Sequence, residues 1–139
     1  MHNRIVAAAA AFVVIASAAG CSEETKPERA RNAKITVDGK TQTTSEISCT
    51  QVEWSLTIKT TSGSARTDSF LQIGGEKPIA KTVNISNFDG FSGVASEGVG
   101  QAEVSLAKND FIVAGTAEGH DRTHPGNTRT ASFRIEAHC

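Results

Sequence analysis

The sequence predicts an all-β domain, an antiparallel β-sandwich or barrel-like sheet of about eight strands, preceded by a helical signal peptide. Three observations favour this fold class. Apolar and polar residues alternate along much of the chain after residue 33, as they do in strands with one buried face. Turn signals recur about every 8 to 15 residues, as in sandwiches and barrels. No stripe of apolar residues at helical spacing follows residue 20.

The first element, residues 1–20, is typical of a secretory signal peptide. Arg4 provides a positive charge, and residues 5–19 that follow contain no charged side chain. Small residues occupy positions 17–20, directly before Cys21, as expected at a cleavage site. This apolar core is shorter than the roughly 20 residues that span a bilayer. We therefore expect an exported protein whose leader is removed.

Cys21 directly follows this leader and becomes the first residue of the mature chain. A thiol at that position can carry a diacylglyceryl group, with fatty acids such as palmitate, and the pattern resembles the bacterial lipobox. Ala18 departs from it, because leucine is commoner at that position. We expect Cys21 to be lipidated and to hold the protein on the extracytoplasmic face of the cell membrane, and at the cell surface. The alternative is an ordinary signal peptide with a cysteine nearby.

Residues 21–32 form the second element, an acylated N-terminus and flexible tether. Residues 22–32 have no large apolar side chain, so they cannot contribute to a core. Residues 33–139 then form one β-domain of ordinary size. The whole chain has 14 basic and 15 acidic residues. This balance argues against a nucleic-acid partner, which would favour clustered lysine and arginine.

The first predicted strand of the domain covers residues 34–37. It ends at Asp38-Gly39, a pair that readily adopts the positive φ of a tight hairpin turn. The next strand carries Ile47 and Cys49. These two segments should form a hairpin at the start of the domain.

Alternation is clearest over residues 52–58, where one face carries Val52, Trp54, Leu56 and Ile58. We expect a single strand there, with this apolar face directed inward. Trp54 is the only tryptophan of the chain. The pattern places its side chain in the core; the alternative is that it forms the floor of a ligand pocket.

The second half of the chain contains further strand-like segments, separated by short polar or glycine-rich turns. The turns are expected at Gly74-Gly75, at Asp89-Gly90 and over residues 108–110. Gly98-Val99-Gly100 indicates a strand bulge or turn, because no helix follows to complete a dinucleotide site. The expected strands cover residues 70–73, 82–88, 91–95, 101–107, 111–116 and 130–137. The last of them should direct Phe133, Ile135 and Ala137 to one face.

The other two cysteines of the chain are Cys49 and Cys139. With Cys21 assigned to lipid, they form one pair, and oxidising compartments convert such pairs into disulfides. We therefore expect a disulfide between Cys49 and the last residue of the chain. The alternatives are two free thiols or a metal-binding pair, which no short Cys or His spacing favours.

The strongest candidate for a metal site is the group Glu118, His120, Asp121 and His124. Histidine and carboxylate groups can bind zinc or copper. However, His120 and His124 would share a face only on a helix, whereas Gly119 and Pro125-Gly126 favour a loop. We expect a solvated loop here, with no metal site. No catalytic residue and no cofactor is expected.

Several of these segments together resemble the LpqH-type mycobacterial lipoprotein antigens. They are Cys21, the run Ile35-Thr36-Val37-Asp38-Gly39-Lys40, Ser48-Cys49-Thr50, residues 111–117, and the terminal residues 132–139. The resemblance implies an acylated envelope lipoprotein, a surface antigen without enzyme activity, whose lipid-bearing N-terminus is sensed by host Toll-like receptors. The alternative function is an envelope binding protein for a lipid or small hydrophobic ligand, since about eight strands can enclose one.

Overall fold

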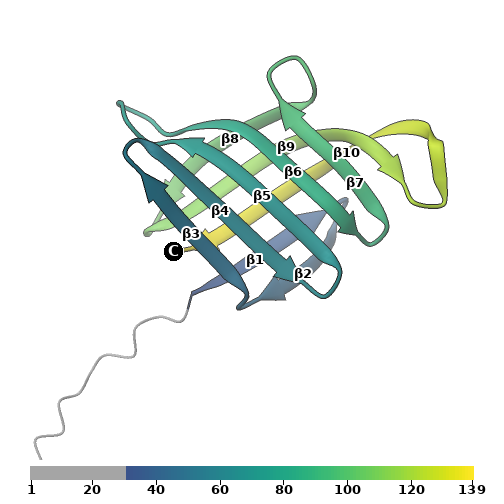
Figure 1. The fold of residues 1–139 in the computed structure, drawn as a ribbon, viewed down its shortest axis with the longest axis horizontal. Coiled ribbons are helices and arrows are strands. Elements are labelled where there is room, and N and C mark those ends of the chain that lie inside the picture. The colour runs from purple at the N-terminus through teal and green to yellow at the C-terminus, as the bar shows by residue number, and fades with distance from the viewer. Residues whose placement is uncertain (1–30) are drawn as a thin grey trace, which may run out of the picture.

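The computed structural model describes residues 31–139, which form ten β-strands (Figure 1). In chain order they are β1 (Asn32–Val37), β2 (Lys40–Thr44), β3 (Ile47–Val52), β4 (Ser55–Ser62), β5 (Ala65–Gln72), β6 (Ile79–Phe88), β7 (Phe91–Ser96), β8 (Gln101–Ala107), β9 (Asp110–Asp121) and β10 (His124–His138). Every pairing between these strands is antiparallel. The predicted all-β fold class is therefore confirmed. The predicted signal peptide and Cys21 lie outside the described residues.

The strands form one barrel-like sheet that folds over into two layers. Its order is β2-β1-β10-β9-β7-β6-β5-β4-β3, with β8 paired to β9 off this path. In Figure 1 the layer of β3 to β7 crosses in front of the layer of β8, β9, β10, β1 and β2. The long strand β9 joins the layers, because one part of it pairs with β8 and another part with β7.

The two ends of this strand order, β2 and β3, are also brought close together. They are consecutive in the chain, and their connection is bonded to β4. The backbone N–H of Thr61 donates to the carbonyl of Glu46 at 2.9 Å, and the Thr44 hydroxyl donates to the Thr61 carbonyl at 2.6 Å. The sheet is therefore nearly closed into a barrel.

The core lies between the layers and is filled by inward-facing apolar side chains. Its largest members include Phe88, Phe91, Ile35, Ile58 and Ile135, each almost inaccessible to solvent. On β10, the side chains of Phe133, Ile135 and Ala137 are all buried, as the alternation predicted. Burial of such side chains is the main favourable contribution to the stability of a domain of this size.

Three of the predicted hairpin turns are present, and each begins with two residues at positive φ. They are Asp38-Gly39, with φ of 49° and 80°, Asp89-Gly90, with 49° and 84°, and Lys108-Asn109, with 51° and 71°. Two successive positive φ values give a turn whose twist matches that of the strands it joins. The choice of turn residues thus fixes three of the strand pairings locally. The expected partner of β1 was wrong, however: β1 forms its hairpin with β2, whereas Ile47 and Cys49 lie on β3, which pairs with β4.

Gly98 and Gly100 lie where the chain leaves β7 and enters β8, as the predicted bulge or turn. Ser96 and Val99 exchange backbone hydrogen bonds of 2.7 and 3.0 Å, which folds the segment back on itself. Gly100 has φ of 67°, and a Cβ placed on it would lie 2.3 Å from the Thr116 carbonyl oxygen. Only glycine fits there, so this position allows β8 to continue along the same edge of β9 as β7.

The prediction for residues 52–58 was wrong in two respects. The chain turns at Glu53 and Trp54 between β3 and β4, and Trp54 is 68% exposed instead of buried. Val52 pairs with Ser55 across this turn, whereas Gln51 pairs with Leu56. Because paired residues share a face, Val52 points outward although Leu56 points inward. The apolar and polar residues alternate without a break across this turn, but the apolar residue before it, Val52, faces outward and the apolar residues after it face inward.

Candidate functional site

The disulfide expected from the cysteine count is present. Cys49 and Cys139 are bonded, with their Cα atoms 5.9 Å apart. Cys49 lies on β3 opposite the buried Ile58 and packs against the core, and Cys139 directly follows β10. Since β3 and β10 belong to different layers, the bond joins the two layers. It has a structural role in the described domain.

The predicted loop around His120 and His124 is instead a hairpin of two long strands. β9 continues to Asp121 and β10 begins at His124, so only the two residues between them form the turn. Gly119, Pro125 and Gly126 had indicated a loop, but they lie on strands. The proline and the glycine after it are tolerated near the tip of this hairpin, because β10 has a free edge there. The side chains are solvated, as expected: Glu118, His120 and His124 are exposed.

The hairpin does not bring the four candidate metal ligands together. Along a strand, successive side chains point to opposite faces. Asp121 is held by Arg129, and the His124 ring nitrogen Nδ1 lies 3.0 Å from the Thr123 hydroxyl. Within residues 31–139, no three His, Cys, Asp or Glu side chains are placed to bind a metal ion.

The most connected polar group in residues 31–139 is centred on Arg129 of β10. Its guanidinium donates to both carboxylate oxygens of Asp121, at 2.7 and 2.9 Å, and to Asp38 at 2.5 Å. The same group lies 4.6 Å from the centre of the Phe91 ring, at cation–π distance. Arg129 therefore ties the β1–β2 turn to the β9–β10 hairpin.

Asp38 also contacts the backbone of β10. Its second carboxylate oxygen accepts from the N–H of Ser132 at 3.1 Å, and its own N–H donates to the Ser132 carbonyl at 2.9 Å. Nearby, Lys40 forms an exposed ion pair with Asp89. Sequence reasoning identified Asp38 as a turn residue but missed its ionic role, because its partners lie about ninety positions away.

These contacts shift three pKa values. Hydrogen bonds from Arg129, more than its charge alone, lower the pKa of Asp121. The hydrogen bonds to Asp121 and Asp38 raise the pKa of Arg129. The hydrogen bond to Asp89 raises the pKa of Lys40. All three shifts favour the charged forms, as expected for groups that stabilise the fold rather than exchange protons.

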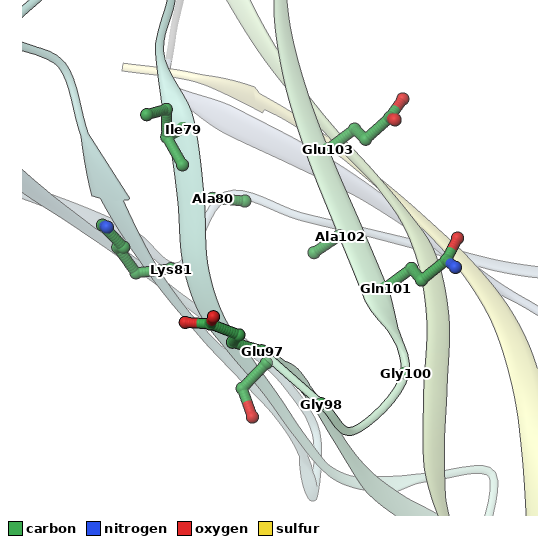
Figure 2. Close-up of a pocket in the computed structure, with 10 residues that line it drawn as sticks. Ile79, Ala80, Lys81, Glu97, Gly98, Gly100, Gln101, Ala102 and Glu103 are labelled. Atoms are coloured by element: carbon green, nitrogen blue, oxygen red, sulfur yellow. The ribbon is translucent and has the colours of Figure 1, made fainter.

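A surface groove of about 510 Å³ lies between β6 and β8 (Figure 2). Ala80 of β6 and Ala102 of β8 face each other across it, while Lys81 and Glu103 point away. β7 pairs with β6 only from Thr82 onward, and β8 pairs with β9. The first residues of β6 therefore have no hydrogen-bonded partner on the β7 side, and the groove lies between them and β8.

A second groove, of about 300 Å³, lies on the outer face of β3, β4 and β5. Its lining includes Val52, Trp54 and Phe70, which are all exposed, together with Lys81. The Trp54 ring packs against Gly74, where an added Cβ would lie 2.8 Å from the ring. In addition, the Trp54 carbonyl accepts from the N–H of Ile73 at 2.8 Å. The exposed tryptophan is thus held in place by the loop after β5.

No helix in residues 31–139 has the length and apolarity needed to cross a membrane.

Comparison with known proteins places these features in a family. The family model described as the Mycobacterium 19 kDa lipoprotein antigen matches residues 26–139. The chain is 34% identical over 142 residues to the probable lipoprotein LppE of Mycobacterium tuberculosis, covering 100% of both chains. It is 33% identical over 140 residues to a putative lipoprotein of Mycobacterium avium subsp. hominissuis, covering 100% of this chain and 97% of the relative.

Lipoprotein LpqH of Mycobacterium bovis is a more distant relative, 28% identical over 153 residues, with 96% of each chain covered. The family match spans the whole described domain, including both cysteines of the disulfide and the Arg129 contacts. The resemblance seen in the sequence is therefore confirmed: this chain belongs to the family of Mycobacterium 19 kDa lipoprotein antigens.

Proposed function

We propose that this protein is exported, acylated on Cys21 and held by its acyl chains on the extracytoplasmic face of the cell membrane. The observation that carries the proposal is the position of Cys21, directly after a leader that has no charge beyond Arg4 and ends in Ala-Ala-Gly. Relatives that match the whole chain are named lipoproteins. Two or more acyl chains on one cysteine are enough for stable membrane attachment, whereas one gives only marginal attachment.

The proposed biological effect follows from this anchor. The protein acts as a surface antigen, and host Toll-like receptors recognise its lipid-bearing N-terminus. The family's description as an antigen supports this role. The β-domain presents epitopes and performs no catalysis. This accords with the contacts of Arg129 with Asp121 and Asp38, which join strands of the sheet.

The groove between β6 and β8 gives less support to the alternative, a binding protein for a lipid or small hydrophobic ligand. The two side chains that face each other across it, Ala80 and Ala102, are small, whereas a site for an apolar ligand is lined mainly by large hydrophobic and aromatic side chains. The space between the two layers is occupied by the core side chains described above.

Intact-mass analysis of protein purified from native membranes tests the anchor. We expect a chain that begins at Cys21 and carries two or three acyl groups. A Cys21→Ala variant should appear in the soluble fraction and should lose stimulation of cells that express Toll-like lipopeptide receptors. A variant that stays on membranes and keeps its stimulation would overturn the proposal. Thr25→Ala is the matched control, since it changes a nearby residue but retains Cys21 and the disulfide.

A further inference from the structure

One end of the domain carries all of the large exposed apolar side chains found in residues 31–139. They are Val52 (67% exposed), Trp54 (68%), Leu106 (57%), Ile79 (50%) and Phe70 (40%). We refer to these five residues as the apolar end. Monomeric soluble domains scatter such side chains singly, whereas a gathered set marks an interaction surface.

The strand register shows why these residues lie together. Val52 pairs with Ser55, Ser55 with Gln72, and Gln72 with Ile79, so Val52 and Ile79 belong to one row across four strands. Trp54 lies in the turn just beyond this row. Phe70 is close by, as it lines one groove with Val52 and Trp54.

The described chain begins at this same end. Asn32 pairs with His138, and one row further into the sheet Ala33 pairs with Ala137, Ala137 with Phe111, and Phe111 with Leu106. In Figure 1 the start of β1, the C-terminus, the β3–β4 turn and the β8–β9 turn all lie toward the left end of the long axis. The opposite end carries the β9–β10 hairpin tip.

We propose that the apolar end rests against the lipid surface that holds the acyl chains of Cys21, with Trp54 at the level of the headgroups. This inference rests on the proposed anchoring through Cys21. Only residues 22–31 separate Cys21 from β1, and even a fully extended segment of that length reaches no farther than about 36 Å, so the anchor keeps this end near the bilayer. Tryptophan favours the membrane interface, where its ring is apolar and its N–H finds water or headgroups.

The anchor also explains how an apolar surface of only five side chains can remain in contact with lipid. Once the acyl chains are inserted, contact between the apolar end and lipid becomes intramolecular, and its effective concentration is high. Charges of both signs lie at this end: Glu53 and Lys81 line the same groove as Trp54, and the β5–β6 loop contains Glu76 and Lys77. Contact should therefore depend on apolar side chains rather than on anionic lipid, and should persist at high salt.

Fluorescence of Trp54 tests this arrangement directly, because Trp54 is the only tryptophan and the chain has no tyrosine. Acylated protein, verified by mass, is reconstituted into vesicles of phosphatidylethanolamine and phosphatidylglycerol. We expect a blue shift of the emission relative to the Cys21→Ala protein in buffer, loss of emission with brominated lipids, and protection from iodide. A spectrum unchanged from that in buffer, with full iodide quenching, overturns the inference.

A control moves the reporter to the other end of the molecule. In a Trp54→Phe background, Thr123→Trp places the tryptophan in the β9–β10 turn, where brominated lipids should have no effect. Equal quenching at both positions would overturn the proposed orientation.

Two further results separate this inference from others. A Trp54 blue shift that grows with the protein-to-lipid ratio, without quenching by brominated lipid, would mean that a second copy covers the apolar end, and would overturn contact with lipid. Absence of acyl groups in the mass spectrum would instead refute the anchor itself. If acylation is verified and Trp54 stays in water, only the orientation fails.

Discussion

Cys139, the last residue of the chain, is bonded to Cys49 on the strand at one end of the sheet order, 90 positions earlier. β3 has only one hydrogen-bonded neighbour, β4, among the described strands. The disulfide supplies a second, covalent attachment for it, to the end of β10 in the other layer.

Removing this bond should destabilise the domain substantially. Closing a loop of 90 residues lowers the entropy of the unfolded chain by an amount worth about 4 to 5 kcal/mol in the chain-entropy model, an upper figure. We expect the double variant Cys49→Ala/Cys139→Ala to unfold at a much lower urea concentration. Reductant should lower the midpoint of the wild-type protein but leave the variant unchanged; an insensitive wild-type protein would contradict this prediction.

The contact between Asp121 and Arg129 predicts a stability that depends on pH. Since the folded-state pKa of Asp121 is lowered, its contribution is present above the ordinary aspartate pKa of about 3.9 and is lost as pH falls through the lowered value. Asp121→Asn should therefore destabilise the domain at neutral pH, and the difference from wild type should shrink in acid. Urea titrations at several pH values measure this difference.

Glu76→Gln is the matched control for Asp121, because Glu76 lies exposed in the loop between β5 and β6. It removes one carboxylate without breaking a contact between strands. A gap between Asp121→Asn and wild type that is the same at all pH values would argue against the ionic contact.

Gly100 should be far less tolerant of substitution than Gly98. Both have positive φ, of 67° and 82°, which costs a non-glycine residue about 1 to 2 kcal/mol. At Gly100 the new Cβ would also meet the Thr116 carbonyl oxygen at 2.3 Å, whereas nothing lies within 4 Å at Gly98. Thermal unfolding of Gly100→Ala and Gly98→Ala should separate the two effects, and equal losses would contradict this packing.

Ser69 predicts a stabilising substitution. Its side chain is 1% exposed, lies between Ile58 and Val83, and its hydroxyl has no hydrogen-bond partner among residues 31–139. Because an unpaired buried hydroxyl costs about 1 to 3 kcal/mol, Ser69→Ala should leave stability unchanged or raise it. Chemical denaturation provides the measurement.

Thr67 on the same strand provides the contrast to Ser69. Its hydroxyl is hydrogen-bonded to that of Thr60 at 2.5 Å, and both residues are buried. Thr67→Val preserves shape but leaves the Thr60 hydroxyl unpaired, so it should cost about 1 to 3 kcal/mol. If Ser69→Ala proved the more damaging of the two, the assigned hydrogen bonding would be wrong.

The sequence by itself was sufficient for the features that depend on neighbouring residues. Alternation identified β8 with the observed bounds and the buried face of β10, since side chains on a strand alternate between its two faces. Asp38-Gly39 and Asp89-Gly90 identified hairpins, because these residues tolerate the positive φ that such turns require. The cysteine count identified the disulfide, as only one pair remained.

Tertiary structure decided what depends on residues far apart in the chain. The pattern around Trp54 read equally well as one strand or as two strands joined by a turn, and only the pairing of Gln51 with Leu56 placed Trp54 outside. Likewise, Arg129 meets Asp38 across 91 positions because β1 pairs with β10. Local propensity cannot determine such pairings, since they depend on how the whole sheet closes to bury its apolar face.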